Sequence, residues 1–486
     1  MSNQGKRILK AVVLTFDRLP THLLGCYGNE WTESPGFDRL ASLGSVFDQH
    51  FAEVPGPVGP DHAWWTGRFE FFSNPESDRH NGDATAQNWI QKLVQNGVKC
   101  RLLAENTEGL PTELFYSSEA VGGVTGLNAA HDDVPIARLI QRGVEILEND
   151  GSTSEPPDGE SSPELIWLHS AGVPSPWLPP RLFAELYLDE LEEVVDGESG
   201  SEIASDLVGQ FENDPDLVRL LLSDWRREVE ADSDLDDGSS QSPESDAEDI
   251  ESPELERQIS RLVFAGYVSM IDRWLLKLLE AVERSDEHIL LVVSANQGHS
   301  FGETVDLVPD PLGAAAFGDD GSAESGPRAG QQGALYDSEV RTPLLMAEFS
   351  ESADGPAFGS RHSALVQPVD LAATLADWVS RGLAGNSLQQ TGSAGVSLLA
   401  ALAGGTPEGR PSAFSLGPDG QLGVRNRNWA LTASADAFCE GDLIETEVQL
   451  FAKPDDQWDV HDVSSQYREE VSSLLDMLRK FRPGSR

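Results

Sequence analysis

The feature that most constrains the fold is a series of short apolar runs that alternate with stretches of helical periodicity. Apolar runs of this length are typical of parallel strands that are buried on both faces. The runs stand at 11–16, 99–104, 164–169, 288–294 and 341–349. The helical stretches stand at 36–44, 88–96, 135–148, 256–284 and 369–382. This alternation predicts an α/β fold with a large, mostly parallel mixed sheet sandwiched by helices.

The sequence pattern of the chain changes near residue 405. Short polar strands separated by Gly, Pro and Asn follow, and a helical stretch at 463–481 closes the chain. This pattern predicts a small α+β unit with an antiparallel sheet and a terminal helix. We therefore expect an α/β domain at 1–404 and a small C-terminal domain at 405–486. Residues 228–254 are rich in Asp, Glu, Ser and Pro, which predicts a disordered acidic insertion.

The charge balance is strongly acidic, with 82 Asp and Glu against 34 Lys and Arg and a net charge of −48. A field of this sign repels nucleic acids and anionic membrane surfaces, so neither is an expected partner. A polysulfated glycan would bind only where a local basic pocket overrides the field. No apolar stretch is long enough to span a bilayer and no signal core is evident, so we expect a soluble, cytoplasmic protein.

The cysteines argue against two further classes of protein. Cys26, Cys100 and Cys439 form an odd, sparse set without a CxxC pair. Such a set is neither a disulfide framework nor a zinc site.

Eight segments, taken in order, resemble one known family. They include AVVLTFDRLPTHLLGCYGNEWTESPGFDRLASLG from residue 11, TGR at 66–68, and LHSAGVPSPWLPP at 168–180. The others are 292–303, 335–345, 369–379, 395–404 and 449–463. Together they resemble the sulfatase family of the alkaline-phosphatase superfamily over nearly the whole chain. The resemblance implies a large mixed sheet between helices and a small C-terminal four-stranded domain.

The resemblance also implies a nucleophile position. Sulfatases use a formylglycine made from Cys or Ser in C/S-x-P-x-R, about ten residues before the TGR. Alignment on Thr66-Gly67-Arg68 places Pro57 at the nucleophile and Asp61 at the Arg of that pattern. Proline has no nucleophilic atom, and Asp61 brings negative charge where the family has positive charge. No cysteine of this chain is followed by Pro at +2 and Arg at +4.

At most of the family's metal and cation positions, too, this chain has residues that carry no charge. Asp17 matches the first Asp ligand, while Asn296 and Gln297 stand where the family has Asp and then His or Asn. Ca²⁺ prefers several charged oxygens, so we expect weak Ca²⁺ binding or no cofactor at all. Pro174 replaces a catalytic His, and Gln332 replaces a Lys.

Three interpretations of the function follow from this resemblance. The first is a catalytically inactive sulfatase homologue that binds a saccharide or protein ligand. The second is an active metal-dependent hydrolase of a sulfate or phosphate ester, with a site rebuilt from Asp17, Asp61, His62 and His299. A third, a conventional sulfatase read in the wrong register, would need a C/S-x-P-x-R segment, which the sequence lacks.

Two adjacent tryptophans allow two interpretations. Trp64 and Trp65 could stack on sugar rings beside a cleft, or they could belong to the core. We favour the core, because the family has apolar residues at these positions.

Overall fold

The computed structural model describes most of the predicted elements. It describes residues 9–69, 88–126, 128–149, 162–173, 179–184, 186–187, 253–300, 335–350, 359–383, 394–417, 420–434 and 448–481. Residues 228–252 of the predicted acidic insertion, together with Pro174, Gln332 and Cys439, lie outside these ranges.

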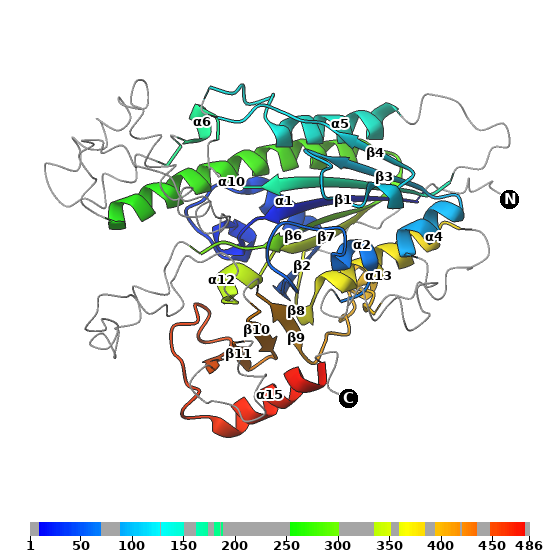
Figure 1. The fold of residues 1–486 in the computed structure, drawn as a ribbon. Helices are drawn as coiled ribbons and strands as arrows, with labels where there is room; N and C mark the ends of the chain where they lie inside the picture. Colours follow the sequence, from blue (N-terminus) through cyan, green and yellow to red (C-terminus); the bar gives the residue numbers. More distant parts are fainter. Residues whose placement is uncertain are drawn as a thin grey trace, which may run out of the picture.

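A mixed eight-stranded sheet forms the centre of the molecule (Figure 1). All neighbouring strands run parallel except β7, which is antiparallel to both of its neighbours. The predicted mostly parallel mixed sheet is confirmed. From edge to edge the strands are β4 (Ser117–Ala120), β3 (Lys99–Ala104), β5 (Glu164–Gly172), β1 (Leu9–Arg18), β6 (His288–Gln297), β7 (Leu344–Phe349), β2 (Ser45–His50) and β8 (Ser360–Val366).

Helices cover both faces of this sheet (Figure 1). One face carries α1 (Pro35–Leu43), α5 (Pro135–Asn149) and α10 (Pro253–Arg284). The other carries α2 (Ala63–Thr66), α4 (Trp89–Gln95) and α13 (Pro368–Ser380). Because side chains alternate along a strand, β1 serves both cores. Its residues Val12, Leu14 and Phe16 face α10, while Ala11 and Val13 face α13.

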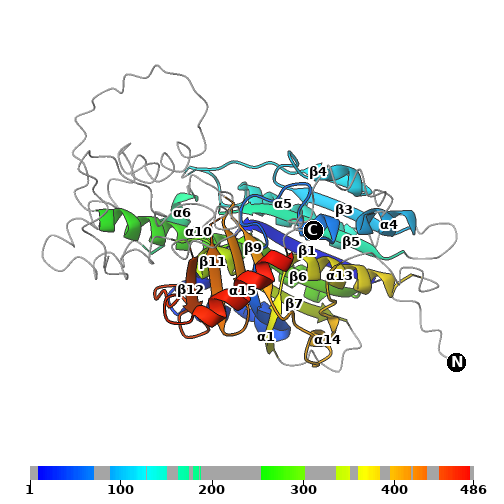
Figure 2. The ribbon, with the colours of Figure 1, turned by 60° about the horizontal axis from the view of Figure 1, so that its bottom comes forward.

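A four-stranded antiparallel sheet forms the C-terminal part of the chain. Helix α15 (Arg468–Phe481) lies across it, as Figure 2 shows, and packs Leu474, Leu475 and Leu478 against the strands. The predicted antiparallel sheet with a terminal helix is therefore confirmed, while the boundary at 404/405 remains a prediction. The strands are β9 (Ala413–Leu416), β10 (Leu422–Arg425), β11 (Trp429–Ala433) and β12 (Val448–Ala452).

Ion pairs with little exposure connect the C-terminal part of the chain to two helices, α12 (Asp337–Val340) and α13. Asp337, at the start of α12, pairs with Arg425 of β10 and lies 3.1 Å from Lys453 Nζ. The side chain of Arg410 likewise donates from Nε to Asp370 Oδ2 of α13 at 2.7 Å. Charges taken out of water need such partners, so these pairs hold the C-terminal part of the chain against α12 and α13.

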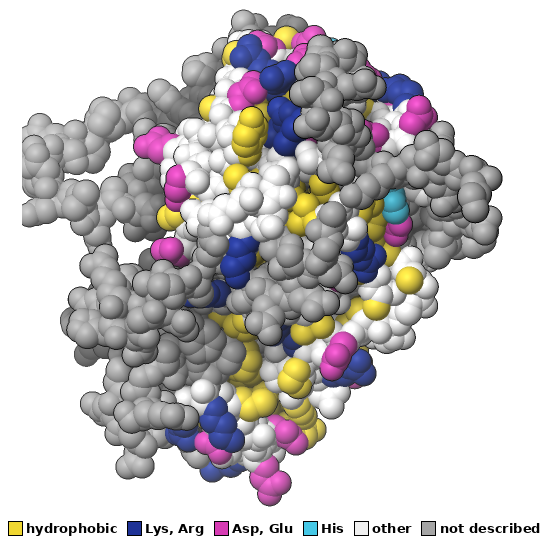
Figure 3. Space-filling view, turned by 90° about the vertical axis from the view of Figure 1, so that its right-hand side faces the viewer, with side chains coloured by type: hydrophobic (Ala, Val, Ile, Leu, Met, Phe, Trp, Pro, Cys, Tyr) yellow, Lys and Arg dark blue, Asp and Glu magenta, His cyan; other side chains and the backbone are white. Residues whose placement is uncertain are grey.

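Acidic and basic side chains both lie on the described surface of the molecule. On the face in Figure 3, acidic and basic side chains are interspersed with apolar ones. None of the helices within the described ranges has the length and apolar character needed to cross a bilayer.

Candidate functional site

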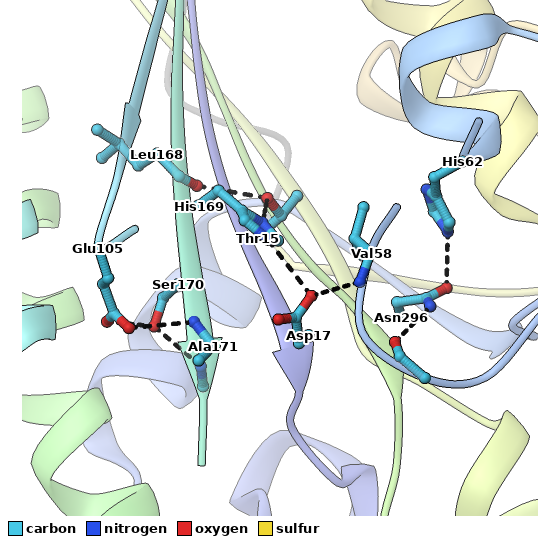
Figure 4. Close-up of polar contacts among 12 residues, drawn as sticks. Thr15, Asp17, Val58, His62, Glu105, Leu168, His169, Ser170, Ala171 and Asn296 are labelled. Atoms are coloured by element: carbon cyan, nitrogen blue, oxygen red, sulfur yellow. Dashed lines mark hydrogen bonds and ion pairs between the residues drawn. The ribbon is translucent and has the colours of Figure 1, made fainter. Parts of the chain in front are cut away.

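Three central strands end side by side at one edge of the large sheet. The register pairs Arg18 of β1 with Gly172 of β5 and with Gln297 of β6. One residue earlier, Asp17 therefore lies between Ala171 and Asn296 (Figure 4). In open α/β sheets, ligand sites form outside the carboxyl ends of the strands.

Asp17 stands at this edge with two polar neighbours. Its Oδ1 accepts a hydrogen bond from Val58 N at 2.8 Å. The same oxygen lies 3.3 Å from Nε2 of His169, and the Asp17 side chain is 24% exposed. The carboxylate thus contacts both a backbone N–H and an imidazole.

Both the oxygen and the nitrogen of the Asn296 side-chain amide form hydrogen bonds within the protein. Its Nδ2 donates to Val54 O and to Gly56 O, each at 2.9 Å. Its Oδ1 accepts from His62 Nε2 at 2.8 Å, and Nδ1 of His62 accepts from Trp64 N at the start of α2. Burial lowers the pKa of His62 to about 4, so the ring is neutral near pH 7.

These contacts hold a loop against the edge of the sheet. Pro57 is exposed and lies between Gly56, whose carbonyl binds Asn296, and Val58, whose N–H binds Asp17. The start of the loop is fixed by β9, because Leu416 N donates to Glu53 O at 2.7 Å. We call residues 54–58 the Pro57 loop.

The other residues predicted for the site lie elsewhere. Gln297 is turned to the opposite face of β6, where its Nε2 donates to Glu339 Oε2 at 3.0 Å. His299 stacks on Phe264 of α10, with ring centroids 4.9 Å apart. Burial and the charge of Arg18 lower the pKa of His299 well below its usual value. Asp61 is exposed in the turn before α2.

The edge contains a histidine that the sequence did not single out. His169 on β5 places Nε2 beside Asp17 and Nδ1 3.0 Å from Thr15 Oγ1. Its ring meets those of Trp64 and Trp65 edge to face at 6.5 and 6.0 Å. His169 is part of the apolar run ELIWLH, which predicts a strand, and the resemblance places the catalytic His at Pro174. Its position at the carboxyl end of a predicted parallel strand was the available signal.

A second carboxylate lies near this edge. Glu105 follows β3 and accepts from Ser170 Oγ at 2.6 Å and from Ala171 N at 3.2 Å. Burial raises the pKa of Glu105 to about 7, so its carboxyl group takes up a proton close to neutral pH.

Of the comparisons with known proteins, the one with solved structures supports the architecture. No protein-family model matches the sequence, and no curated protein matches it. Solved structures do match. BT4656, solved with its substrate D-glucosamine-2-N,6-O-disulfate, has a TM-score of 0.60 and 15% identity, covering 98% of this chain and 97% of its own. BT1596, a 2-O GAG sulfatase, has a TM-score of 0.57 at 15% identity, with 98% and 92% covered.

A third structure comes from a related class of enzyme. The phosphonate monoester hydrolase of Agrobacterium radiobacter has a TM-score of 0.56 at 14% identity, with 97% of this chain and 94% of that chain covered. This chain has the sulfatase fold. Because phosphonate hydrolysis is performed on the same fold, the sulfatase fold alone does not assign an activity.

The residues at the edge do not suit the cation that the sulfatase resemblance implies. Within the described ranges, no group of three or more His, Cys, Asp or Glu side chains is placed to hold a metal ion. Asp17 is the one predicted ligand with a carboxylate, and the Asn296 oxygen already accepts from His62. A hard cation prefers several charged oxygens, so this set of side chains does not fit Ca²⁺.

Proposed function

We propose that this chain is a catalytically inactive protein with the sulfatase fold that works as a binding module. One observation carries the proposal. Asp17 and Asn296, which the resemblance assigns to the metal, hydrogen-bond to the Pro57 loop instead.

The chemistry of ester hydrolysis supports this proposal. Hydrolysis of a sulfate ester on this fold would need an activated nucleophile, a cation and positive groups around the sulfuryl oxygens. Pro57 has no nucleophilic atom. The hydrogen bonds from Asn296 Nδ2 to Gly56 O and from Val58 N to Asp17 Oδ1 bring Pro57 to the metal-ligand positions, which supports the alignment that gives it the nucleophile's place. Thr15, whose hydroxyl contacts His169, is fully buried.

The solved neighbours suggest a class of ligand. BT4656 was solved with a sulfated glucosamine as its substrate, and Ps i-CgsB with k-i-k-neocarrahexaose. By analogy with those proteins, we propose a saccharide as the ligand of this chain. A fold-level analogy of this kind names a class to test and no particular sugar.

An ester screen tests the proposed inactivity. Purified protein would be assayed with 4-methylumbelliferyl sulfate, 4-methylumbelliferyl phosphate and an aryl phosphonate monoester, each with Ca²⁺, Mg²⁺ or Mn²⁺. We expect no turnover above that of Asp17→Ala and His169→Ala, prepared in the same way. Turnover by the wild type that both substitutions abolish would refute the proposal. It would favour an active hydrolase built around the Asp17–His169 pair.

A further inference from the structure

A pocket of about 330 Å³ lies apart from the Asp17 edge. It is formed by the segment that follows β1, by α10, by the start of α12 and by a loop of the small C-terminal part. Asp17, His169 and Asn296 are not among its lining residues. The side chains that matter here are those of Tyr27, Trp31, Arg261, Arg341 and Trp458.

Two arginines give the pocket a preference for anions. The guanidinium of Arg261 lies 5.1 Å from the ring centroid of Trp31, and that of Arg341 lies 6.0 Å from that of Tyr27. These contacts orient the planar groups, whose forks match sulfate, phosphate and carboxylate oxygens. Two carboxylates also line the pocket. The charge of Asp337 is balanced by Arg425 and Lys453. Glu30 is exposed at the rim, and the two guanidinium groups together carry one positive charge more than its one negative charge.

Aromatic rings give the pocket apolar faces. Trp31, Trp458 and Tyr27 are each partly exposed. Trp31 is held by an edge contact with Tyr187, at 5.7 Å between ring centroids, and Trp458 by a similar contact with His22 at 5.9 Å. Rings fixed in this way present a large contact area at a small entropic cost.

We propose that this pocket binds a saccharide unit that carries an anionic group. The sugar ring lies against Trp31 or Trp458, and Arg261 and Arg341 bind the sulfate, phosphate or carboxylate. The volume suits one hexose-sized unit, because small-molecule sites begin at about 300 Å³. In a chain with a net charge of −48, such a local basic pocket is what an anionic sugar requires.

This proposal gives the binding function a site and a ligand chemistry. It rests on the proposed saccharide ligand and not on the loss of catalysis, because the pocket and the Asp17 edge use different residues. Ester turnover would refute the inactivity and leave the pocket untouched. A failure to bind anionic sugars would refute the pocket and leave the inactivity standing.

Titration calorimetry on the full chain tests the pocket. The probes are glucose 6-sulfate, glucose 6-phosphate and glucuronic acid, compared with glucose, inorganic sulfate and inorganic phosphate. We expect saturable binding of at least one anionic sugar. Glucose should bind at least about tenfold more weakly because it lacks the charge-assisted bonds, and the inorganic ions because they lack the ring.

Matched variants separate the pocket from general charge. Arg261→Gln and Trp31→Leu should each weaken the binding by about tenfold or more. The control is Arg381→Gln, because Arg381 lies 5.9 Å over the ring of Trp378, outside the pocket, and its removal changes the net charge equally. Thermal unfolding would confirm that every variant is folded. The proposal is wrong if no anionic sugar binds, if glucose or an inorganic ion binds as tightly, or if Arg261→Gln and Arg381→Gln bind alike.

Discussion

Replacing Asn296 by leucine should destabilise the protein through the Pro57 loop. Asn296 is 1% exposed, and its amide makes the three hydrogen bonds to His62, Val54 and Gly56. Leucine has nearly the same size but can neither donate nor accept. Asn296→Leu therefore leaves one buried imidazole N–H and two loop carbonyls without their partner.

The magnitude follows from the burial of those three groups. His62 is 2% exposed, so the loss of its acceptor costs about 1–2 kcal/mol. Val54 and Gly56 are partly exposed, and water can reach their carbonyls, so each costs at most about 1 kcal/mol. We expect a loss of about 3 kcal/mol in the free energy of unfolding.

Urea unfolding followed by tryptophan fluorescence measures this loss, and hydrogen exchange at Val58 reports on the loop itself. The control is Asn96→Leu, because the Asn96 amide makes one exposed hydrogen bond, to Lys92 O. That substitution should cost less than about 1 kcal/mol. If Asn296→Leu costs no more than Asn96→Leu and Val58 exchanges as in the wild type, Asn296 does not hold the loop and the reasoning fails.

Three further predictions concern stability. Glu105→Gln should gain stability relative to the wild type as the pH rises from about 4.5 to 7, by about 2 kcal/mol, because a folded-state pKa of about 7 makes ionisation of this partly buried acid costly. A stability difference that is flat in pH, measured by urea unfolding, would contradict this. Arg410→Met should cost about 3 kcal/mol in the same assay because it leaves Asp370 buried without its cation, whereas Arg39→Met, at an exposed pair, should cost less than about 1 kcal/mol; equal losses would refute the difference. Trp65→Ala should lower the unfolding free energy by about 4 kcal/mol because the ring is fully buried, and a loss under about 1 kcal/mol would show that the ring is not core.

The central strands were predictable because both of their faces are buried. β1, β3, β5, β6 and β7 therefore read as continuous apolar runs, and each was placed to within a few residues. Strands at the sheet edges and those with polar faces gave no such run. All four residues of β4 are exposed, and β8 alternates partly exposed and exposed residues over its first four positions before its buried end.

The candidate site could be predicted only in part. Asp17 and Asn296, which the resemblance assigns to a metal site, lie on neighbouring strands at one edge of the sheet, while their role as ligands stays a prediction. The buried pair Trp64–Trp65 is confirmed as core. Gln297 was grouped with Asn296, but adjacent strand residues point to opposite faces. His169 was missed because its partner Asp17 is 152 positions away in the chain, and only the strand register brings the two together.

Divalent-ion content tests the central claim most directly. Purified protein would be equilibrated with excess Ca²⁺, freed of unbound ion and analysed by mass spectrometry of the metal, beside Asp17→Ala. Because Asp17 and Asn296 hold the Pro57 loop, we predict far less than one ion per chain and no difference from Asp17→Ala. One tightly bound ion per chain that Asp17→Ala releases would contradict the account.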